Sequence, residues 1–151
     1  MLELARKEDR KAVNALALQV HAMHVAWRPD LYETVEEVYT EERFSAALKE
    51  RSLYVARIND AIAGYVAVKI RDFDWPGVVR RKVMLIDELC VDELCRSQGI
   101  GTEMMAEVRV LAKAFGCTDL QLNVNAHNDE AVGFYQKCGF HIQNISMHRK
   151  V

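Results

Sequence analysis

The chain has 151 residues, of which 50% are hydrophobic and 28% are charged, and its formal net charge is −2 at pH 7. This length suits one folded domain over residues 1–151, with enough buried surface for a core of its own. A nucleic-acid-binding domain usually has a basic excess, which this chain lacks, and its apolar stretches are too short to span a bilayer. We therefore expect a globular protein with neither a nucleic-acid nor a membrane partner.

The four cysteines are Cys90, Cys95, Cys117 and Cys138, and no two of them form a Cys-x-x-Cys pair. No secretory hydrophobic region opens the chain. Free thiols are typical of reduced compartments, so the sequence predicts a cytoplasmic protein without disulfides.

The first half of the chain alternates between helical and strand periodicities. In chain order we expect a strand at 2–5, helices at 9–25 and 34–48, a hairpin of strands at 52–58 and 62–70, a loop at 72–80 and a strand at 83–91. Pro29 ends the first helical pattern, because the residue before a proline avoids the α region. Thr34, followed three residues later by Glu37, predicts a capping box at the start of the second helix.

The second half contains a strong helical pattern at 99–115, then a strand at 120–124, a short helix at 130–138 and a strand at 140–147. The full order is β-α-α-β-β-β-α-β-α-β. Antiparallel hairpin strands that lead into a crossover unit predict a mixed α/β fold.

The sharpest local feature is the run Arg96-Ser97-Gln98-Gly99-Ile100-Gly101, between a strand and a helix. Glycines allow backbone N–H groups to approach a ligand closely, and a helix N-terminus attracts anions. Arg96 could add a positive charge and Thr102 a hydroxyl group. A phosphate-bearing ligand is one interpretation; a plain strand-to-helix turn is the other.

Two common phosphate motifs do not match this run. A dinucleotide fingerprint needs glycine at position 104, which is Met104, and a nucleoside triphosphate loop needs a lysine before Thr102.

A second motif spans residues 128–140 and reads Asn-Asp-Glu-Ala-Val-Gly-Phe-Tyr-Gln-Lys-Cys-Gly-Phe. It resembles the pattern Asn-x-x-Ala-x-x-Phe/Leu-Tyr-x-x-x-Gly-Phe of the GNAT superfamily of acyl-CoA-dependent N-acetyltransferases. The 96–101 run is similar to the pyrophosphate motif of that family, Gln/Arg-x-x-Gly-x-Gly/Ala. Both motifs lie in the expected order and spacing, and the order of the predicted elements also matches.

The resemblance implies a central, mostly antiparallel, twisted sheet of six to seven strands. Helices would cover both faces, and the strands would splay at the CoA-binding position. It also implies acetyl-CoA as co-substrate, no metal, and a small-molecule or peptide amine as acceptor. A homodimer through an exposed 140–147 strand is a further expectation.

The resemblance also implies a role for particular residues. The amides of the 98–102 turn would hold the CoA pyrophosphate, backbone groups of two strand residues would pair with the pantetheine arm, and Tyr135 would donate a proton to the CoA sulfur. The implied cofactor-binding residues are Leu89, Val91, Arg96, Gln98, Gly99, Ile100, Gly101, Thr102, Asn128 and Tyr135.

An amine must be neutral to attack a thioester, although a lysine-like amine has a pKa near 10.4 in water. A base, or a water chain that ends in one, should therefore remove its proton. Asp87 and Glu88 are adjacent acids in an apolar strand. We prefer Glu88 because it immediately precedes Leu89, one of the residues that would pair with the pantetheine arm. The tetrahedral intermediate needs a hydrogen-bond donor, and the resemblance implies that a backbone N–H of Leu89 or Cys90 supplies it.

Several alternatives stay open at this stage. His21 and His24 are three residues apart on a predicted helix, but no spacing pattern supplies further metal ligands. The enzyme could use a longer acyl-CoA, or the chain could be a catalytically weak CoA-binding regulatory module. The first two helices and the 72–80 loop are expected to choose the acceptor, which the sequence does not identify.

Overall fold

The computed structural model describes residues 1–151, the whole chain. Its elements are β1 (Leu2–Leu4), η1 (Lys7–Asp9), α1 (Arg10–Trp27), α2 (Glu41–Glu50), β2 (Leu53–Ile58), β3 (Ala61–Phe73), β4 (Arg81–Val91), η2 (Glu93–Cys95), α3 (Ile100–Ala114), β5 (Asp119–Leu122) and α4 (Asp129–Lys137). The mixed α/β class predicted from the sequence is confirmed. None of these helices has both the length and the apolar character that a membrane span requires.

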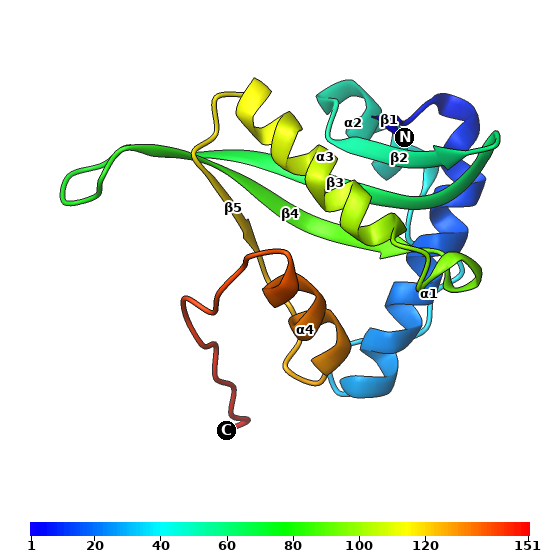
Figure 1. Ribbon diagram of the computed structural model, residues 1–151. Helices are drawn as coiled ribbons and strands as arrows, with labels where there is room; N and C mark the ends of the chain where they lie inside the picture. The colour runs from blue at the N-terminus through cyan, green and yellow to red at the C-terminus, as the bar shows by residue number, and fades with distance from the viewer.

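One sheet organises the fold, and its strands follow the chain in the order β1-β2-β3-β4-β5 (Figure 1). The first four strands pair antiparallel, whereas β5 joins β4 in parallel after the α3 crossover. The predicted Asn59-Asp60 turn joins β2 to β3, and both residues have positive φ values, as a tight hairpin turn requires. The sheet is mostly antiparallel, as expected, but it has five strands instead of six to seven.

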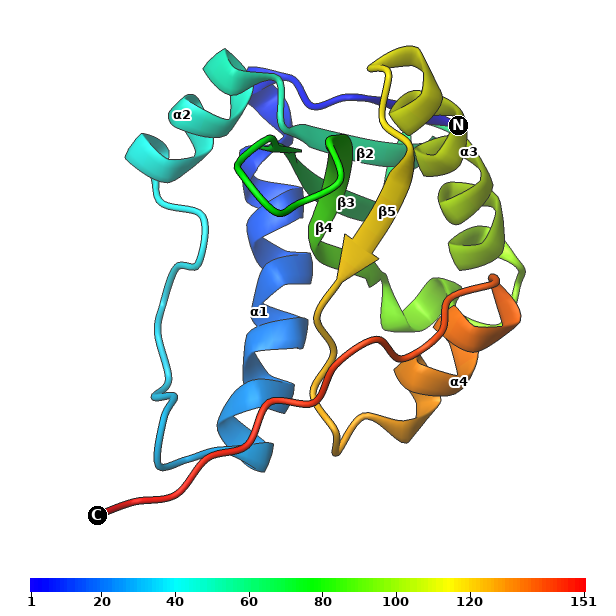
Figure 2. The ribbon, with the colours of Figure 1, turned by 90° about the vertical axis from the view of Figure 1, so that its left-hand side faces the viewer.

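Helices cover both faces of the sheet, as predicted. Figure 2 shows α1 and α2 on one side of the strands, with α3 and α4 on the other. Strand side chains alternate between two cores, because successive residues point to opposite faces. Val55 and Tyr65 are buried on the α1 face, whereas Tyr54 and Val66 are buried on the α3 face.

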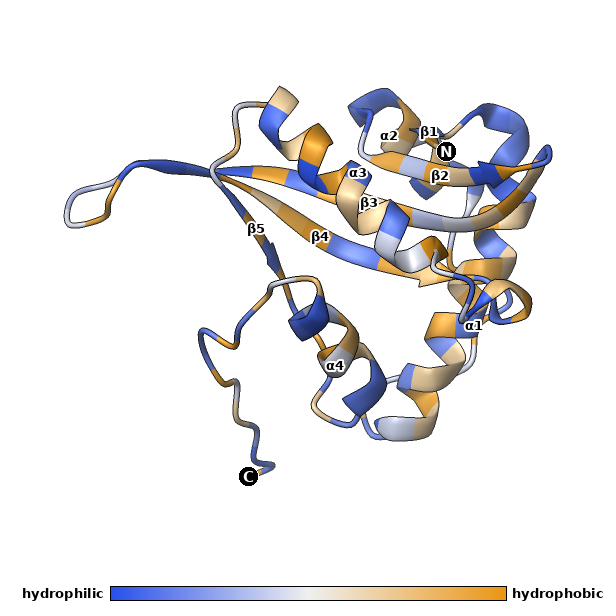
Figure 3. Cartoon of the chain, in the orientation of Figure 1, coloured by the Kyte–Doolittle hydropathy of each residue, from blue (hydrophilic) through white to orange (hydrophobic).

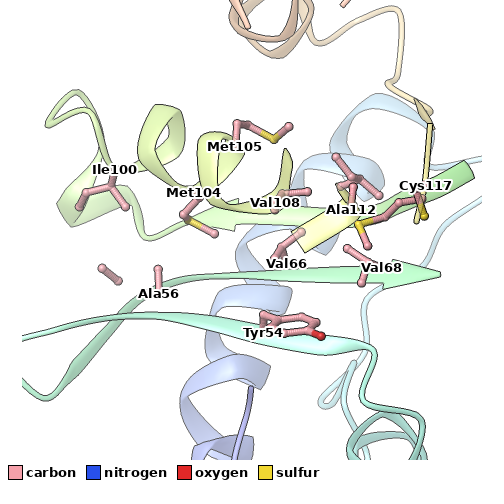
Figure 4. Close-up of a cluster of buried hydrophobic side chains, with 13 residues drawn as sticks. Tyr54, Ala56, Val66, Val68, Ile100, Met104, Met105, Val108, Ala112 and Cys117 are labelled. Carbon is pink, nitrogen blue, oxygen red and sulfur yellow. The ribbon is translucent and has the colours of Figure 1, made fainter. Parts of the chain in front are cut away.

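The α3 core is the larger of the two clusters of buried apolar side chains (Figure 4). Met104 and Val108 recur on one stripe of α3 and pack against the sheet, and both are fully buried. Hydropathy shows the same arrangement: α3 carries both blue and orange segments, and orange predominates along the strands beneath it (Figure 3).

The second helix begins later than the sequence predicted. Residues 28–40 are irregular, and α2 starts at Glu41 with Thr40 as its N-cap, whose hydroxyl accepts a hydrogen bond from the Arg43 amide at 3.2 Å. The capping box at Thr34 and Glu37 was therefore wrong. The amides of Val38 and Tyr39 instead donate to Oδ1 of Asn14 at 2.8 and 2.9 Å, which holds this segment extended along α1.

The predicted strand at 140–147 is also wrong. The chain after α4 is extended but pairs with no strand, and Ile142, Ile145 and Met147 are 66%, 82% and 92% exposed. It ends beside the residues that follow α1, where Lys150 lies 3.9 Å from Asp30 (Figure 2). Alternating apolar residues become a strand only when a neighbouring strand supplies hydrogen bonds, and none does so here.

We predict that Gly64→Ala destabilises the fold. A Cβ at Gly64 in β3 would lie 2.5 Å from the carbonyl oxygen of Cys90 in β4 and 3.0 Å from Sδ of Met104. Overpacking of this kind costs about 1–3 kcal/mol, which urea unfolding would measure. Gly133→Ala is the matched control, because it lies in α4 with open space around its Cβ. That change should stabilise the protein by up to about 1 kcal/mol. Unchanged stability of Gly64→Ala would contradict the close packing.

Candidate active site

The site begins where two strands separate. β5 pairs with β4 only from Val83 to Ile86, and beyond that point β4 pairs with β3 alone. The amide of Asp92 donates to the carbonyl of Ala63 in β3. In an antiparallel pair, alternate residues point their backbone groups toward the partner strand. The backbone groups of Leu89 and Val91 therefore point away from β3. The sequence hypothesis chose these two residues for the pantetheine arm, and their N–H and C=O groups face the gap.

A cavity of about 690 Å³ opens at this gap. Its walls come from α1, the end of β4, the turn before α3, and α4. The lining residues are Val20, Met23, His24, Trp27, Leu89, Cys90, Val91, Cys95, Arg96, Ser97, Gly99, Ile100, Gly101, Thr102, Asn128, Asp129, Glu130, Ala131, Gly133, Phe134, Tyr135 and Lys137. Of the predicted site residues, Gln98 and Glu88 alone are outside this lining.

The turn before α3 has the shape of an anion site. Gly99 has a φ of 83°, which favours glycine, and α3 begins at the next residue. The first helical hydrogen bond runs from the Glu103 amide to the Gly99 carbonyl. The amides of the first helical turn before it therefore have no acceptor in the helix, and they lie at its positive end. Gly101 serves packing, because a Cβ there would lie 3.2 Å from Cζ of Phe134.

Arg96 lies beside the same turn. Its Nε donates to the carbonyl of Val91 at 3.2 Å, which fixes the base of the guanidinium against the end of β4. Its two terminal nitrogens form no hydrogen bond or ion pair within the chain. A phosphate group at the turn would therefore meet both backbone amides and a guanidinium, so these residues fit the pyrophosphate of a CoA thioester.

Tyr135 lies in α4, across the cavity from α1. Its ring packs between Phe134 and Phe140, at centroid distances of 5.1 and 5.7 Å. Burial raises the pKa of Tyr135 to about 12, so the hydroxyl is protonated at neutral pH and can donate a hydrogen bond. The hydroxyl has no hydrogen-bond partner in the chain.

Glu88 points to the α1 face instead of the cavity. Its Oε2 accepts hydrogen bonds from the hydroxyls of Tyr39 at 2.9 Å and Tyr65 at 3.0 Å, and Arg43 donates to Oε1 at 3.2 Å. Burial, reinforced by this carboxylate, raises the pKa of both tyrosines. The alternative acid, Asp87, forms an ion pair with Lys69 at 2.6 Å and does not line the cavity either.

The first helix was expected to help choose the acceptor, but none of the α1 residues that line the cavity was among the predicted site residues. His24 and Trp27 lie on this α1 wall, with their ring centroids 5.9 Å apart, and His24 stacks on Tyr32 at 5.1 Å. Burial, followed by repulsion from His21, holds the pKa of His24 below its ordinary value. The His21/His24 spacing was a sequence signal for a shared face, and the metal site that it raised was set aside for want of further ligands.

The loop between β3 and β4 lies far from this cavity. It leads into Arg81 at the start of β4, whereas the cavity lies at Leu89–Val91 at the end of the strand. At about 3.3 Å a residue, the two ends of this strand are roughly 30 Å apart. The expectation that the 72–80 loop helps to choose the acceptor therefore does not fit the structure. The residues that face the gap opposite Tyr135 belong to α1.

Comparison with known proteins agrees with this arrangement. The Acetyltransferase (GNAT) family model matches residues 19–140. The uncharacterized N-acetyltransferase MJ1207 of Methanocaldococcus jannaschii is 31% identical over 97 residues, which are 64% of this chain and 42% of that protein. The chain therefore spans less than half the length of that relative.

Two further relatives match nearly the whole chain. The peptidyl-lysine N-acetyltransferase YjaB of Salmonella typhimurium is 29% identical over 150 residues, which cover 97% of this chain and 88% of that protein. The crystal structure of a mutant BH1408 protein from Bacillus halodurans matches with a TM-score of 0.94 at 28% identity, covering 100% of this chain and 99% of that one. With its family motifs, its fold and its cavity in agreement, the chain belongs to the GNAT family of acyl-CoA-dependent N-acetyltransferases.

Proposed function

We propose that the protein transfers an acetyl group from acetyl-CoA to a primary amine by direct attack in a ternary complex. One observation carries this proposal: a single cavity joins the anion-binding turn before α3, the unpaired edge of β4 and the Tyr135 hydroxyl. These are the three features that a CoA thioester needs, namely a phosphate site, a track for the pantetheine arm and a donor at the sulfur.

In this proposal the backbone binds most of acetyl-CoA. The amides of the 98–102 turn and the Arg96 guanidinium hold the pyrophosphate, and Leu89 and Val91 pair with the pantetheine amides as a neighbouring strand would. Oδ1 of Asn128 already accepts a hydrogen bond from the Ala131 amide at the start of α4, so its NH₂ group is the part left for the pantetheine arm.

Two groups of the chain stabilise the charges that develop during transfer. The Leu89 amide faces the gap and donates to the oxyanion, whereas the Cys90 amide faces β3, so we choose Leu89 of the two candidates. The Tyr135 hydroxyl gives its proton to the departing sulfur. A thiol has a reference pKa near 8.5, whereas the pKa of Tyr135 is about 12, so transfer of the proton from Tyr135 to the thiolate is unfavourable by itself. Tyr135 must therefore regain a proton as it donates one.

Direct attack is favoured over a covalent acetyl-cysteine route by the state of Cys90. Burial raises the pKa of its thiol to about 11, and Sγ lies 3.5 Å from the carbonyl of Leu16, to which it donates. A thiol is a poor nucleophile until it loses its proton. We propose that Glu88 acts through its charge and through the side chains it holds, since its carboxylate lies outside the cavity lining.

The acceptor is a primary amine on a small molecule or a peptide, and it enters between α1 and α4. The printed name of YjaB assigns that relative a peptidyl-lysine acceptor, which makes a lysine side chain one of the amines to screen. We propose a cytoplasmic location, which the four free cysteines support because such thiols persist in reduced compartments.

We further propose a homodimer through the C-terminal segment. Strand β5 pairs with β4 on one side only, and its other edge borders a groove lined by residues of the segment after α4. An open strand edge and an exposed apolar segment are each unfavourable in water. The 140–147 segment of a second copy, paired along β5, would cover both.

The phosphate site predicts that Gly99→Val weakens acetyl-CoA binding by at least about tenfold. A β-branched residue disfavours the positive φ at this position, so the turn must rearrange and its amides move. Isothermal titration with acetyl-CoA measures the change. Gly77→Val is the matched control, since Gly77 also has a positive φ and open space but lies in the β3–β4 loop. If Gly99→Val binds as tightly as the parent, the assignment of this turn is wrong.

The role of Tyr135 predicts that Tyr135→Phe lowers kcat by a factor on the order of 10²–10⁴, the usual contribution of a positioned acid. Affinity for acetyl-CoA should change little, because the phosphate contacts lie on other elements. Release of CoA in steady state, with an amine found by screening, gives kcat. Tyr54→Phe is the control, because it also removes a tyrosine hydroxyl, but from the α3 core, and its kcat should not change. An unchanged kcat for Tyr135→Phe would remove this acid from the mechanism.

The dimer proposal predicts a dimer mass in sedimentation velocity, and a monomer mass for the double variant Ile145→Lys with Met147→Lys. Two charges on the exposed segment should prevent it from packing on a partner. Val79→Lys is the control, because Val79 is also exposed and apolar, at 84%, but lies in the β3–β4 loop. A parent mass that stays monomeric at all concentrations would refute the proposal.

A further inference from the structure

His24 lies in the wall of the cavity, where the proposed reaction still lacks a base. Transfer to an amine needs a group that removes a proton, and the two acids chosen from the sequence, Asp87 and Glu88, are both outside the cavity lining. His24 lines that cavity from α1, whereas Leu89 and Tyr135 line it from β4 and α4. We propose that His24 is the catalytic base that accepts the proton of the acceptor amine. This inference rests on the proposed acetyl transfer.

The hydrogen bonding of His24 supports this role. Nδ1 is buried, and it is the only buried side-chain nitrogen or oxygen of the chain without a hydrogen-bond partner. Such atoms are uncommon in folded proteins, and each calls for an explanation. The neighbouring His21 contrasts with it, because its Nε2 lies 2.6 Å from the carbonyl of Glu33. Nε2 forms no hydrogen bond in the chain and is not a buried atom, so it is the ring nitrogen that a substrate in the cavity can reach.

The surroundings of His24 keep the imidazole neutral and able to take a proton. Burial and the neighbouring His21 on α1 lower its pKa, whereas the charge of Glu88 on β4 acts in the opposite direction and favours the imidazolium. Tyr32, from the segment before α2, stacks on the ring. Lys137 of α4 lines the same cavity. A neutral imidazole at neutral pH has a lone pair, and the nearby carboxylate then stabilises the charge it acquires.

Other acids of the cavity are weaker candidates. Asp129 and Glu130 lie in the first turn of α4, where both are exposed. Solvent therefore surrounds both carboxylates, whereas His24 is part-buried in the cavity wall. Cys90 is protonated at neutral pH, because burial raises the pKa of its thiol to about 11. His24 is the lining residue whose ordinary pKa lies closest to the working pH.

The proton balance of the step is complete. The acceptor ammonium gives one proton to His24, and the neutral nitrogen then forms the C–N bond with the acetyl carbonyl. The C–S bond breaks, and Tyr135 gives its proton to the sulfur. The second proton leaves the new amide nitrogen and restores Tyr135. His24 finally releases its proton to solvent.

The first experiment uses a binding probe and needs no turnover. A CoA thioether with an S-(2-aminoethyl) arm carries a primary amine beside the sulfur, and the S-propyl thioether is its apolar match. The parent should bind the amine probe about tenfold more tightly than the propyl probe, because a hydrogen bond from a charged group is lost in the latter. In His24→Phe this preference should vanish while propyl-probe affinity stays. An equal preference in His24→Phe and the parent would overturn the proposal.

The second experiment follows turnover against pH with an amine found by screening. The acidic limb of kcat/KM for the parent should lie below pH 6.5, the ordinary pKa of histidine. His24→Gln should lose this limb, and kcat should fall by a factor on the order of 10²–10⁴. The loss should shrink as pH rises toward the pKa of the amine, because more of the amine is then neutral in solution. A purely structural defect would show no such recovery.

Two other histidines serve as comparisons. His127→Gln changes an exposed histidine outside the cavity and should leave the pH profile unchanged. His21→Gln removes the repulsion that lowers the pKa of His24, so the acidic limb of kcat/KM for this variant should move to higher pH. If His24→Gln retains the limb and the parent rate, His24 is not the base, although acetyl transfer stands. If the parent acetylates no amine, the proposed function fails, and the probe pair still decides whether His24 faces the amine position.

Discussion

The separation of β4 from β5 is the constraint on which the active site depends. The two strands share hydrogen bonds over four residues, and then β5 ends at Leu122 while β4 continues to Val91. A strand with one unpaired edge inside a fold must satisfy its backbone groups elsewhere. Here that edge faces a cavity, and α3 begins just beyond the end of β4. The open edge and the helix N-terminus therefore lie in the same cavity, which suits a ligand that carries both amides and phosphates.

A polar network around Glu88 lies on the α1 face of β4. This carboxylate receives hydrogen bonds from Tyr39 of the irregular segment, Tyr65 of β3 and Arg43 of α2, and Asn14 of α1 receives the Tyr39 amide. A half-buried carboxylate is stable when its oxygens accept hydrogen bonds, so this network ties the four elements to one another. The network fixes the segment that carries Tyr32 against His24, and in this way links the acidic strand position to the α1 wall.

Local patterns predicted the elements well where one interaction decided them. The Asn59-Asp60 turn needs only its own two residues, and the α3 stripe repeats over four turns, so both appear as expected. The capping box predicted at Thr34 was wrong because the amides of Val38 and Tyr39 donate to Asn14 of α1, which is a contact between distant parts of the chain. The 140–147 strand failed for the same kind of reason: a strand needs a neighbour, and periodicity does not say whether one is within reach.

The sequence by itself determined the family, and it predicted an acetyl-CoA site at two contiguous motifs. The 96–101 turn and the 128–140 motif are contiguous, and their chemistry depends on local backbone shape and helix ends. Only the tertiary structure decided which side chains line the cavity. It turned Glu88 toward three hydrogen-bond donors on the α1 face, left His24 in the cavity wall, and put the β3–β4 loop at the far end of its strand. These positions depend on how α1 crosses the sheet and on which face each strand residue occupies, and both arise from contacts between segments far apart in the chain.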